Sequence, residues 1–288
     1  MRIAAELVVN GILLGGLYAL MACGLNLIFG VMKVINFAHG EFLAIGALST
    51  VWLVVGLQLP FWVALVLVPI GMGALGVVVQ TTLIRRVADG PMIMSLLLTY
   101  ALSTILVNVA ILIWGGGFRG LPGVLGGSFD IMGLHLSRAR LLAFAVAMAA
   151  SIGVWVFLNT HIIGKAIRAV SQEPEIATIS GISVEWVRNL TFGLGAAMAG
   201  AAGVLIAPMF ASEAQLGVRF LIKAFAVIII GGMGSYTGAM AAAIFLGVVE
   251  VVGGYWLGQI FGTALLYGLM LAVLLVRPRG LLGIGART

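Results

Sequence analysis

The residues best suited to chemistry form a short polar segment, residues 34–42, between two apolar runs. Asn36, His39 and Glu41 bring together an amide, an imidazole and a carboxylate. Such groups need partners at membrane depth, so they are candidates to line a solute route or to cap a discontinuous helix. Alternatively, Asn36 simply caps a helix whose first turn holds Glu41, where the helix dipole favours a carboxylate. A proton relay or a metal site would need more groups than His39 and Glu41 supply.

A second candidate lies in residues 231–238, where glycines and hydroxyl residues separate two apolar stretches. Gly231, Gly232 and Gly234 leave backbone groups outside a regular helix, and such groups survive at membrane depth only beside protein or a water-filled cavity. We therefore expect a broken helix that borders the same solute route. Glu250, farther along, is either a functional intramembrane carboxylate or a helix-end residue that faces water.

A third candidate is the polar stretch of residues 164–182. Pro174 suits a first helical position, Glu173 and Glu175 suit the positive end of a helix, and Gly181 suits its C-terminal cap. The pattern predicts a helix of about two turns, which is too short to be stable alone in water. It either docks on another protein or merely connects two spans.

The sequence contains no motif for ATP hydrolysis. No G-x-x-x-x-G-K-[ST] occurs, and Gly164-Lys165 is followed by Ala166. No nucleophile and base stand out as a pair, and the single cysteine, Cys23, cannot form an intrachain disulfide or a cysteine metal cluster. We therefore expect a non-enzyme without a cofactor of its own.

The composition indicates that these segments are positioned by membrane-spanning helices. Of 288 residues, 62% are hydrophobic and 8% are charged, with a mean hydropathy of +1.24, whereas a soluble domain carries about a quarter charged residues. Residues 42–84 exceed one span, and the turn sequence at 56–60 divides them. The uncharged runs are residues 7–32, 42–84, 92–117, 141–160, 189–212, 224–249 and 251–276.

The first apolar run could be a cleaved signal, since a basic start precedes it and residues 20–23 resemble a lipoprotein cleavage site. However, Glu6 interrupts the early part, and residues 7–32 are longer than the apolar region of a signal. We expect an uncleaved first span.

The distribution of basic residues gives the orientation. The residues that mark the cytoplasmic side are Arg85, Arg86, Lys165, Arg168, Arg277, Arg279 and Arg287. This assignment puts the N-terminus outside, five spans before the polar stretch and about three to four after it, and Arg119, Arg138 and Arg140 on the outer side. Because the basic residues lie at the ends of apolar runs, the net charge of +6 does not indicate nucleic-acid binding.

We therefore predict an all-α polytopic membrane protein with about eight to nine spans, some of them broken. The whole chain, 1–288, forms one transmembrane domain: a first half (1–160), a cytoplasmic segment (161–188) and a second half (189–288). A weak internal repeat relates the spans of the two halves, as in many transporters.

The sequence resembles the LivH-type permease family of branched-chain amino-acid ABC importers. The motifs that carry this resemblance, in order along nearly the whole chain, are residues 10–11, 16–20, 29–31, 35–42, 164–181, 231–235 and 277–281. It implies the type II importer fold, a second, LivM-like permease, two cytoplasmic ATPase subunits that use the ATP, and a periplasmic binding protein, in a bacterial inner membrane. The residues that it assigns to a coupling helix are Gly164, Arg168, Ala169, Glu173, Pro174, Ala177 and Gly181.

Three alternatives remain open at the level of sequence. Relatives that carry urea, short amides or aromatic acids share much of the pattern. A secondary transporter could couple a proton through Glu41, His39 or Glu250. A membrane scaffold would have no solute route at all.

Overall fold

The computed structural model describes residues 2–121, 124–131, 134–277 and 280–281. Met1, Pro278, Arg279 and Arg287 lie outside the described residues. The elements, in chain order, are α1 (Arg2–Met32), α2 (His39–Val51), the π-helix η1 (Trp52–Gly56), α3 (Phe61–Thr82), the 3₁₀-helix η2 (Ile84–Arg86), α4 (Met92–Trp114), β1 (Ser128–Ile131), β2 (Leu134–Ser137), α5 (Arg138–Thr160), α6 (Ile162–Gln172), α7 (Pro174–Ile179), α8 (Val184–Ile206), α9 (Leu216–Gly231), α10 (Tyr236–Leu257) and α11 (Gln259–Val276).

Within the described residues, eight helices are long and apolar enough to cross a membrane. They are α1, α2 with η1, α3 with η2, α4, α5, α8, α10 and α11. The ninth long element, α9, has 16 residues and falls short of a full span. The all-α polytopic architecture with some broken spans is therefore confirmed, and β1 and β2 add only a short antiparallel hairpin.

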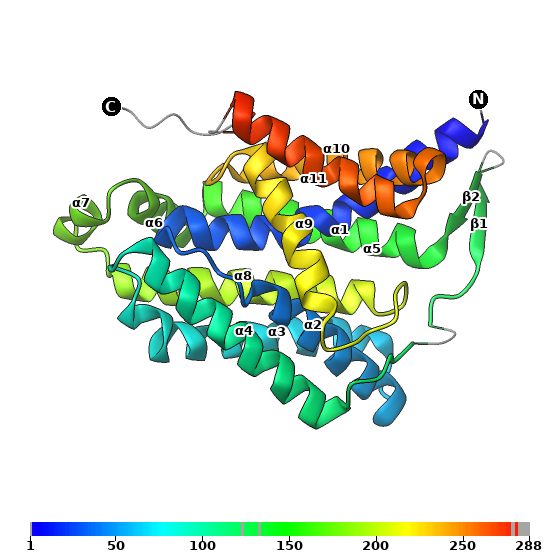
Figure 1. Cartoon of the computed structure of the whole chain (residues 1–288). Helices are drawn as coiled ribbons and strands as arrows, with labels where there is room; N and C mark the ends of the chain where they lie inside the picture. The colour runs from blue at the N-terminus through cyan, green and yellow to red at the C-terminus, as the bar shows by residue number, and fades with distance from the viewer. Residues whose placement is uncertain (1, 122–123, 132–133, 278–279, 282–288) are drawn as a thin grey trace.

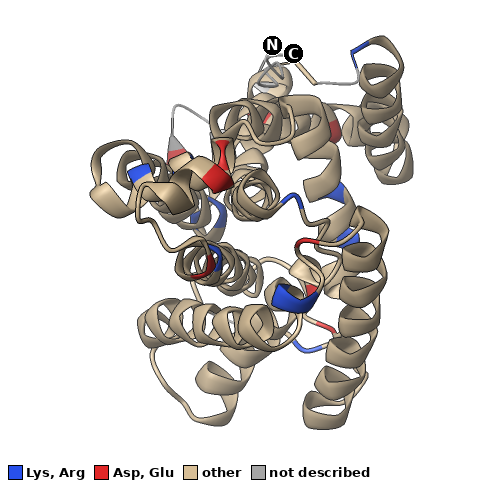
Figure 2. Cartoon of the chain, turned by 90° about the vertical axis from the view of Figure 1, so that its left-hand side faces the viewer, with Lys and Arg blue, Asp and Glu red and all other residues tan. Residues whose placement is uncertain are grey.

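The long helices lie side by side, and α9 crosses them obliquely (Figure 1). α6 and α7 project at one end of the bundle, and the β1–β2 hairpin lies at the other. Arg85 in η2 pairs with Glu185 in the first turn of α8 at the α6–α7 end. This is the end that the positive-inside rule predicts to face the cytoplasm. Five spans precede α6 and α7, as predicted. Seen from this end, charged residues are sparse and lie mostly near helix ends and connections (Figure 2).

The arginines that the sequence places on the outer side find partners at the hairpin end. Arg119 pairs its backbone with the connection that follows α8. Arg140 donates a hydrogen bond to the Asn10 side-chain oxygen at 2.8 Å, and the Arg138 guanidinium lies 4.7 Å from the centre of the Phe129 ring. Local partners thus accommodate the charges of Arg138 and Arg140 on the side that the positive-inside rule disfavours.

Glycines allow the central helices to approach at backbone distance. A Cβ on Gly15 of α1 would lie 2.6 Å from the Ile244 Cα of α10, and a Cβ on Gly203 of α8 would lie 2.2 Å from the Leu43 carbonyl oxygen of α2. Because lipid removes the hydrophobic drive between helices, close van der Waals contact between small residues holds such helices together. The buried core consequently centres on α1, α2, α8 and the inner faces of α9 and α10.

The boundaries of the last spans differ from the uncharged runs 224–249 and 251–276. Glu250 does not end a span; it lies inside α10, and the breaks fall at residues 232–235 and at Gly258. The charge is tolerated inside the helix because Lys223 of α9 pairs with it. The weak internal repeat and the three-part division of the chain stay predictions.

Gly247→Ala is expected to lower the melting temperature of the purified chain in detergent. A Cβ at this position would lie 2.5 Å from the Gly11 carbonyl oxygen and 2.6 Å from the Gly15 Cα, and overpacking of this kind costs about 1–3 kcal/mol. Gly71→Ala in α3 is the matched control, since nothing lies within 4 Å of a Cβ there. Equal melting temperatures for both variants and the unmodified chain would contradict the close packing of α1 against α10.

Candidate functional site

The chain between α1 and α2 turns back into the membrane, and α2 begins near its middle. The His39 ring nitrogen Nε2 lies 3.2 Å from the Met21 carbonyl oxygen of α1. Met21 precedes the end of α1 at Met32 by 11 residues, or about 16 Å at 1.5 Å per residue, roughly half of the hydrocarbon thickness. Polar groups at the start of α2 therefore lie at a depth where water supplies no partners.

One face of α4 supplies hydrogen bonds to this break. The Thr99 hydroxyl donates to the Ile35 carbonyl at 2.9 Å and accepts from the Phe37 amide at 3.1 Å. The Ser103 hydroxyl donates to a Glu41 carboxylate oxygen at 3.0 Å. Neither residue was predicted from the sequence, although Thr99 and Ser103 are spaced by one helical turn within an apolar run, which is the signal for a polar face on a spanning helix.

Asn36 does not cap α2, so that interpretation is wrong. The N-cap is Ala38, which makes no side-chain cap hydrogen bond, and Asn36 contributes only its carbonyl, which accepts from the His39 amide. Among the described residues, both polar atoms of the buried Asn36 side chain and the Nδ1 atom of buried His39 have no hydrogen-bond partner. The expected position of Glu41 in the first turn is confirmed.

The predicted break near residue 231 is confirmed: α9 ends at Gly231 and α10 begins at Tyr236. Asn26 of α1, which the sequence analysis did not single out, clamps the turn between them. Its side-chain NH₂ donates to the Ser235 carbonyl, and its oxygen accepts from the Gly234 amide, both at 2.7 Å. Gly232 and Gly234 have φ angles of +104° and +88°, which favour glycine.

The two breaks do not form a single cluster. The α2 break contacts α1 at Met21, whereas the α9–α10 turn contacts α1 at Asn26, closer to the cytoplasmic end. Thus Asn36, His39 and Glu41 lie in one place, and Gly231, Gly232 and Gly234 in another. α1 connects them, because it supplies hydrogen-bonding groups to both.

A charged cluster lies inside the bundle, and only one of its members, Glu250, was singled out from the sequence. Lys223 of α9 donates to a Glu250 carboxylate oxygen at 2.6 Å and to the Tyr18 hydroxyl at 2.9 Å. Tyr18 in turn donates to the other Glu250 oxygen at 2.7 Å. Glu250 is thus neither a free carboxylate nor a helix-end residue; a lysine and a tyrosine from two other helices hold it.

The cytoplasmic stretch forms two helices, α6 and α7, rather than one. Glu173, which precedes Pro174, has φ −147° and ψ 93°, and the proline ring disfavours the helical conformation at that position. Pro174 starts α7, as predicted, and Gly181 follows its end with φ +83°. These two features fix the direction in which the short α7 leaves α6.

The residues assigned to coupling differ in exposure. Gly164 and Ala177 are buried, Ala169 and Pro174 are half-buried, and Arg168, Glu173 and Gly181 are exposed. The most prominent apolar surface comes from residues that the sequence analysis did not select, Ile176 and Ile179, which are 61% and 87% exposed. α7 thus presents hydrophobic side chains outside the membrane-spanning part of the chain.

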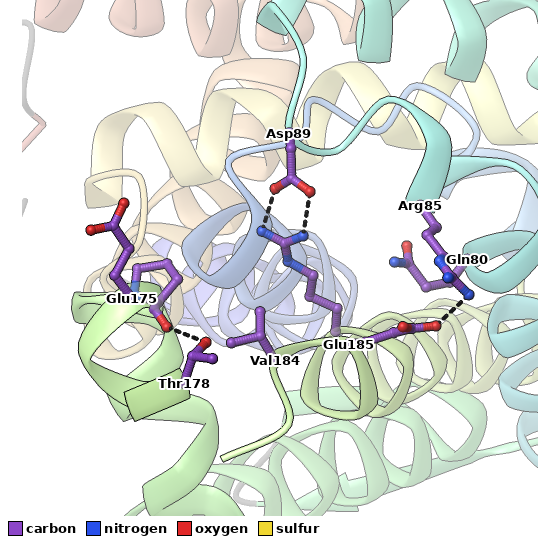
Figure 3. A pocket seen from close by; sticks show the side chains of 9 residues that line it. Gln80, Arg85, Asp89, Glu175, Thr178, Val184 and Glu185 are labelled. Atoms are coloured by element: carbon purple, nitrogen blue, oxygen red, sulfur yellow. Dashed lines mark hydrogen bonds and ion pairs between the residues drawn. The ribbon is translucent and has the colours of Figure 1, made fainter. Parts of the chain in front are cut away.

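A cavity of about 410 Å³ lies between α7, the first turn of α8 and the α3–α4 connection, which comprises residues 83–91 (Figure 3). Arg188 donates two hydrogen bonds to the Asp89 carboxylate, at 2.7 and 3.1 Å, and Glu185 pairs with Arg85 at 2.5 Å. These hydrogen bonds from the Arg188 guanidinium hold the pKa of Asp89 below its usual value. The described residues contain no group of three histidine, cysteine or acidic side chains that could hold a metal ion.

The sequence matches the family described as "Branched-chain amino acid transport system / permease component" over residues 7–275. The chain belongs to this family. The resemblance that the motifs indicated is therefore confirmed, and it covers nearly the whole permease domain.

Curated relatives agree with this assignment. The chain is 31% identical to the high-affinity branched-chain amino acid transport system permease protein BraD of Pseudomonas aeruginosa, over 96% of this chain and 94% of that protein. It is 28% identical to the corresponding permease protein LivH of Escherichia coli, over 95% and 94%. LivM of the same organism is 26% identical over 92% of this chain and 68% of that protein.

A solved structure shares the fold. PsaBC from Streptococcus pneumoniae in complex with Fab superposes with a TM-score of 0.52 at 15% sequence identity, over 94% of this chain and 91% of the other. This likeness at low identity concerns the arrangement of the helices and not the solute. Together with the family match, it supports the importer-permease fold predicted from the sequence.

Lys223→Met is expected to destabilise the fold, because it removes the ion-pair partner of Glu250 inside the bundle. Removing one member of a buried pair costs about 3–5 kcal/mol. The double variant Lys223→Met/Glu250→Gln removes both charges and should recover most of the loss. Thermal unfolding in detergent gives the melting temperature of the unmodified chain, the single variant and the double variant. A double variant that melts no higher than the single variant would contradict a stabilising ion pair.

Proposed function

We propose that the chain is a permease subunit of an ATP-driven importer that moves branched-chain amino acids across a bacterial inner membrane. Membership of the permease family and relatives whose names state branched-chain amino-acid transport support this proposal. A second permease completes the membrane channel, and the similarity of the chain to both LivH and LivM of Escherichia coli supports this assignment. Two cytoplasmic ATPase subunits and a periplasmic binding protein complete the transporter.

The observation that carries the proposal is the exposed apolar surface of α7. Ile176 and Ile179 project from a six-residue helix at the cytoplasmic end, where α7 stands out from the bundle (Figure 1). A helix this short is not stable alone. Burial of the two exposed isoleucines against another protein lowers the free energy. Because the sequence has no phosphate-binding loop for ATP, we assign ATP hydrolysis to the subunit that covers α7.

The solute route is proposed to run along α4 and the start of α2. Tyr100, Thr104 and Asn108 form an exposed stripe on α4, spaced by one turn. Among the described residues, the Thr104 and Asn108 side chains donate only to carbonyl oxygens of α4 itself, and polar side chains are costly against lipid. The second permease therefore covers this face, and the amino acid passes between the two chains.

The aromatic side chains beside this stripe suit an apolar solute. The Phe37 ring lies 6.4 Å from Tyr100 and 5.4 Å from Phe225, centre to centre. The Asn36 side chain and the Nδ1 atom of His39, which have no hydrogen-bond partner among the described residues, can provide polar contacts once the start of α2 opens. A mostly apolar route binds a branched side chain weakly and releases it readily, as a transport path requires.

The proton-coupled alternative finds less support. Glu250 forms an ion pair with Lys223, and Glu41 accepts a hydrogen bond from Ser103. A fixed partner for each carboxylate leaves neither one free as an obvious proton carrier.

Ile179→Glu is expected to release the ATPase subunits from the membrane complex. A charge on the apolar surface of α7 would have to lose water at the interface without a partner, which weakens binding. Co-purification of the ATPase with a tagged permease measures the effect, and Ile179→Leu, which keeps the apolar surface, is the control. Retention of the ATPase in full by Ile179→Glu would argue against α7 as the docking helix.

The complete transporter in vesicles, with binding protein on the outer-facing side and ATP on the other, is expected to accumulate radiolabelled leucine. Unlabelled isoleucine and valine should compete, whereas urea, acetamide and phenylalanine should not. Uptake should persist in the presence of an uncoupler and stop without ATP. Competition by phenylalanine or by urea, without competition by isoleucine and valine, would reassign the solute. Loss of uptake with the uncoupler would favour proton coupling.

A further inference from the structure

Two ion pairs connect the first turn of α8 to the α3–α4 connection. Arg188 donates one hydrogen bond to each carboxylate oxygen of Asp89, and Glu185 forms an ion pair with Arg85 (Figure 3). A two-point contact between a guanidinium and a carboxylate fixes direction as well as distance. The side chain of Arg188 is only 18% exposed, so the surrounding chain holds it in place, whereas Asp89 is 76% exposed.

α6 and α8 both flank α7 and pack against it, and α8 carries the side chains that bridge to the α3–α4 connection. Only residues 180–183 separate the end of α7 from the start of α8, and Ser183 caps α8 by accepting a hydrogen bond from the Trp186 amide. Glu185 and Arg188 therefore lie within the first turns after the docking helix. A displacement of α7 by a bound subunit would be felt at these two residues before it is felt deeper in the membrane.

The cavity shows that α7 does not push on the α3–α4 connection directly. Pro174, Glu175 and Thr178 of α7 line one side, and Arg85 and Asp89 line another. Open space of about 410 Å³ separates the two walls. The first turn of α8 borders this space and carries the charged side chains that bridge to the connection.

The connection leads into the helix that borders the proposed solute route. Asp89 precedes α4, which begins at Met92, by three residues. α4 packs mainly against α2 and η2, whereas α3 packs along much of α8. α3 will follow α8 through that packing, but α4 depends on its cytoplasmic connection. A pull on Asp89 is consequently a pull on the helix whose Thr99 and Ser103 hold the start of α2.

We infer that the Arg188–Asp89 pair relays the movement of α7 and α8 to α4, and thereby to the break at the start of α2. Both are positioning residues: they touch neither solute nor ATP in this scheme. The inference rests on the proposed function, because it presupposes that an ATPase subunit moves α7. It adds a second mechanical link, so that docking and channel opening depend on different residues.

The exposed position of Asp89, whose side chain is 76% exposed, makes the inference testable there without loss of the fold. Ion pairs that remain accessible to water contribute little to stability, so variants at Asp89 are expected to assemble normally. A pair that transmits movement, in contrast, should change how much solute is carried for each ATP hydrolysed. That ratio separates a relay from a merely structural contact.

The test uses the complete transporter in vesicles, with leucine uptake and ATP hydrolysis measured in the same preparation. Asp89→Arg and Arg188→Asp should each keep binding to the ATPase subunits and lower the leucine carried per ATP by about threefold or more, the range in which residues that couple distant sites act. The exchange Asp89→Arg/Arg188→Asp should restore most of the ratio. Arg86→Asp is the control, because Arg86 is an exposed neighbour for which the described residues show no ion pair.

The outcomes are distinct. An unchanged ratio in both single variants, or no recovery in the exchange variant, would overturn the relay. Should Asp89→Arg fail to assemble, Asp89→Ala carries the same expectation with a smaller perturbation. If the unmodified vesicles show no ATP-driven leucine uptake, the proposed function itself fails, whereas normal uptake with indifferent variants refutes only the relay.

Discussion

Backbone hydrogen bonding inside hydrocarbon is the constraint on which the rest of this structure depends. Lipid offers no donor or acceptor, so every interruption of a helix must be matched by groups from elsewhere in the protein. α1 provides such groups at three levels. Tyr18 contacts the charged cluster, the Met21 carbonyl contacts His39, and Asn26 holds the turn before α10. This one helix therefore allows two broken elements and an ion pair to exist within the membrane.

Close packing makes these contacts possible. α1 approaches α10 at glycines whose Cβ would collide with the facing backbone, and the same holds for α2 against α8. Helices at such distances can exchange short hydrogen bonds between side chain and backbone. Tight contact also limits sliding of one helix along another. We therefore expect α1, α10 and α9, which the charged cluster connects, to move as one unit.

α4 has a different character. It packs on one side, against α2 and η2, and exposes a stripe with Tyr100, Thr104 and Asn108 on the other. Its hydroxyls hold the start of α2, and its cytoplasmic end follows directly after the ion pair of Asp89. A helix with few neighbours, polar groups on both faces and a charged anchor at one end is the element best placed to move during a transport cycle.

The sequence by itself determined the membrane class, the turn that divides residues 42–84, the break before α10 and the start of α7 at Pro174, because apolar length, glycine and proline act locally. The three-dimensional structure decided the partners. Lys223 and Tyr18 lie 205 positions apart along the chain, and Glu250 could be interpreted as a helix end until their contact was known. Likewise, no sequence pattern reveals that the Thr99 hydroxyl forms hydrogen bonds with the backbone of residues 35 and 37, or that Asn36 does not cap α2. A sequence shows which polar groups need partners; packing of distant segments determines which group supplies each one.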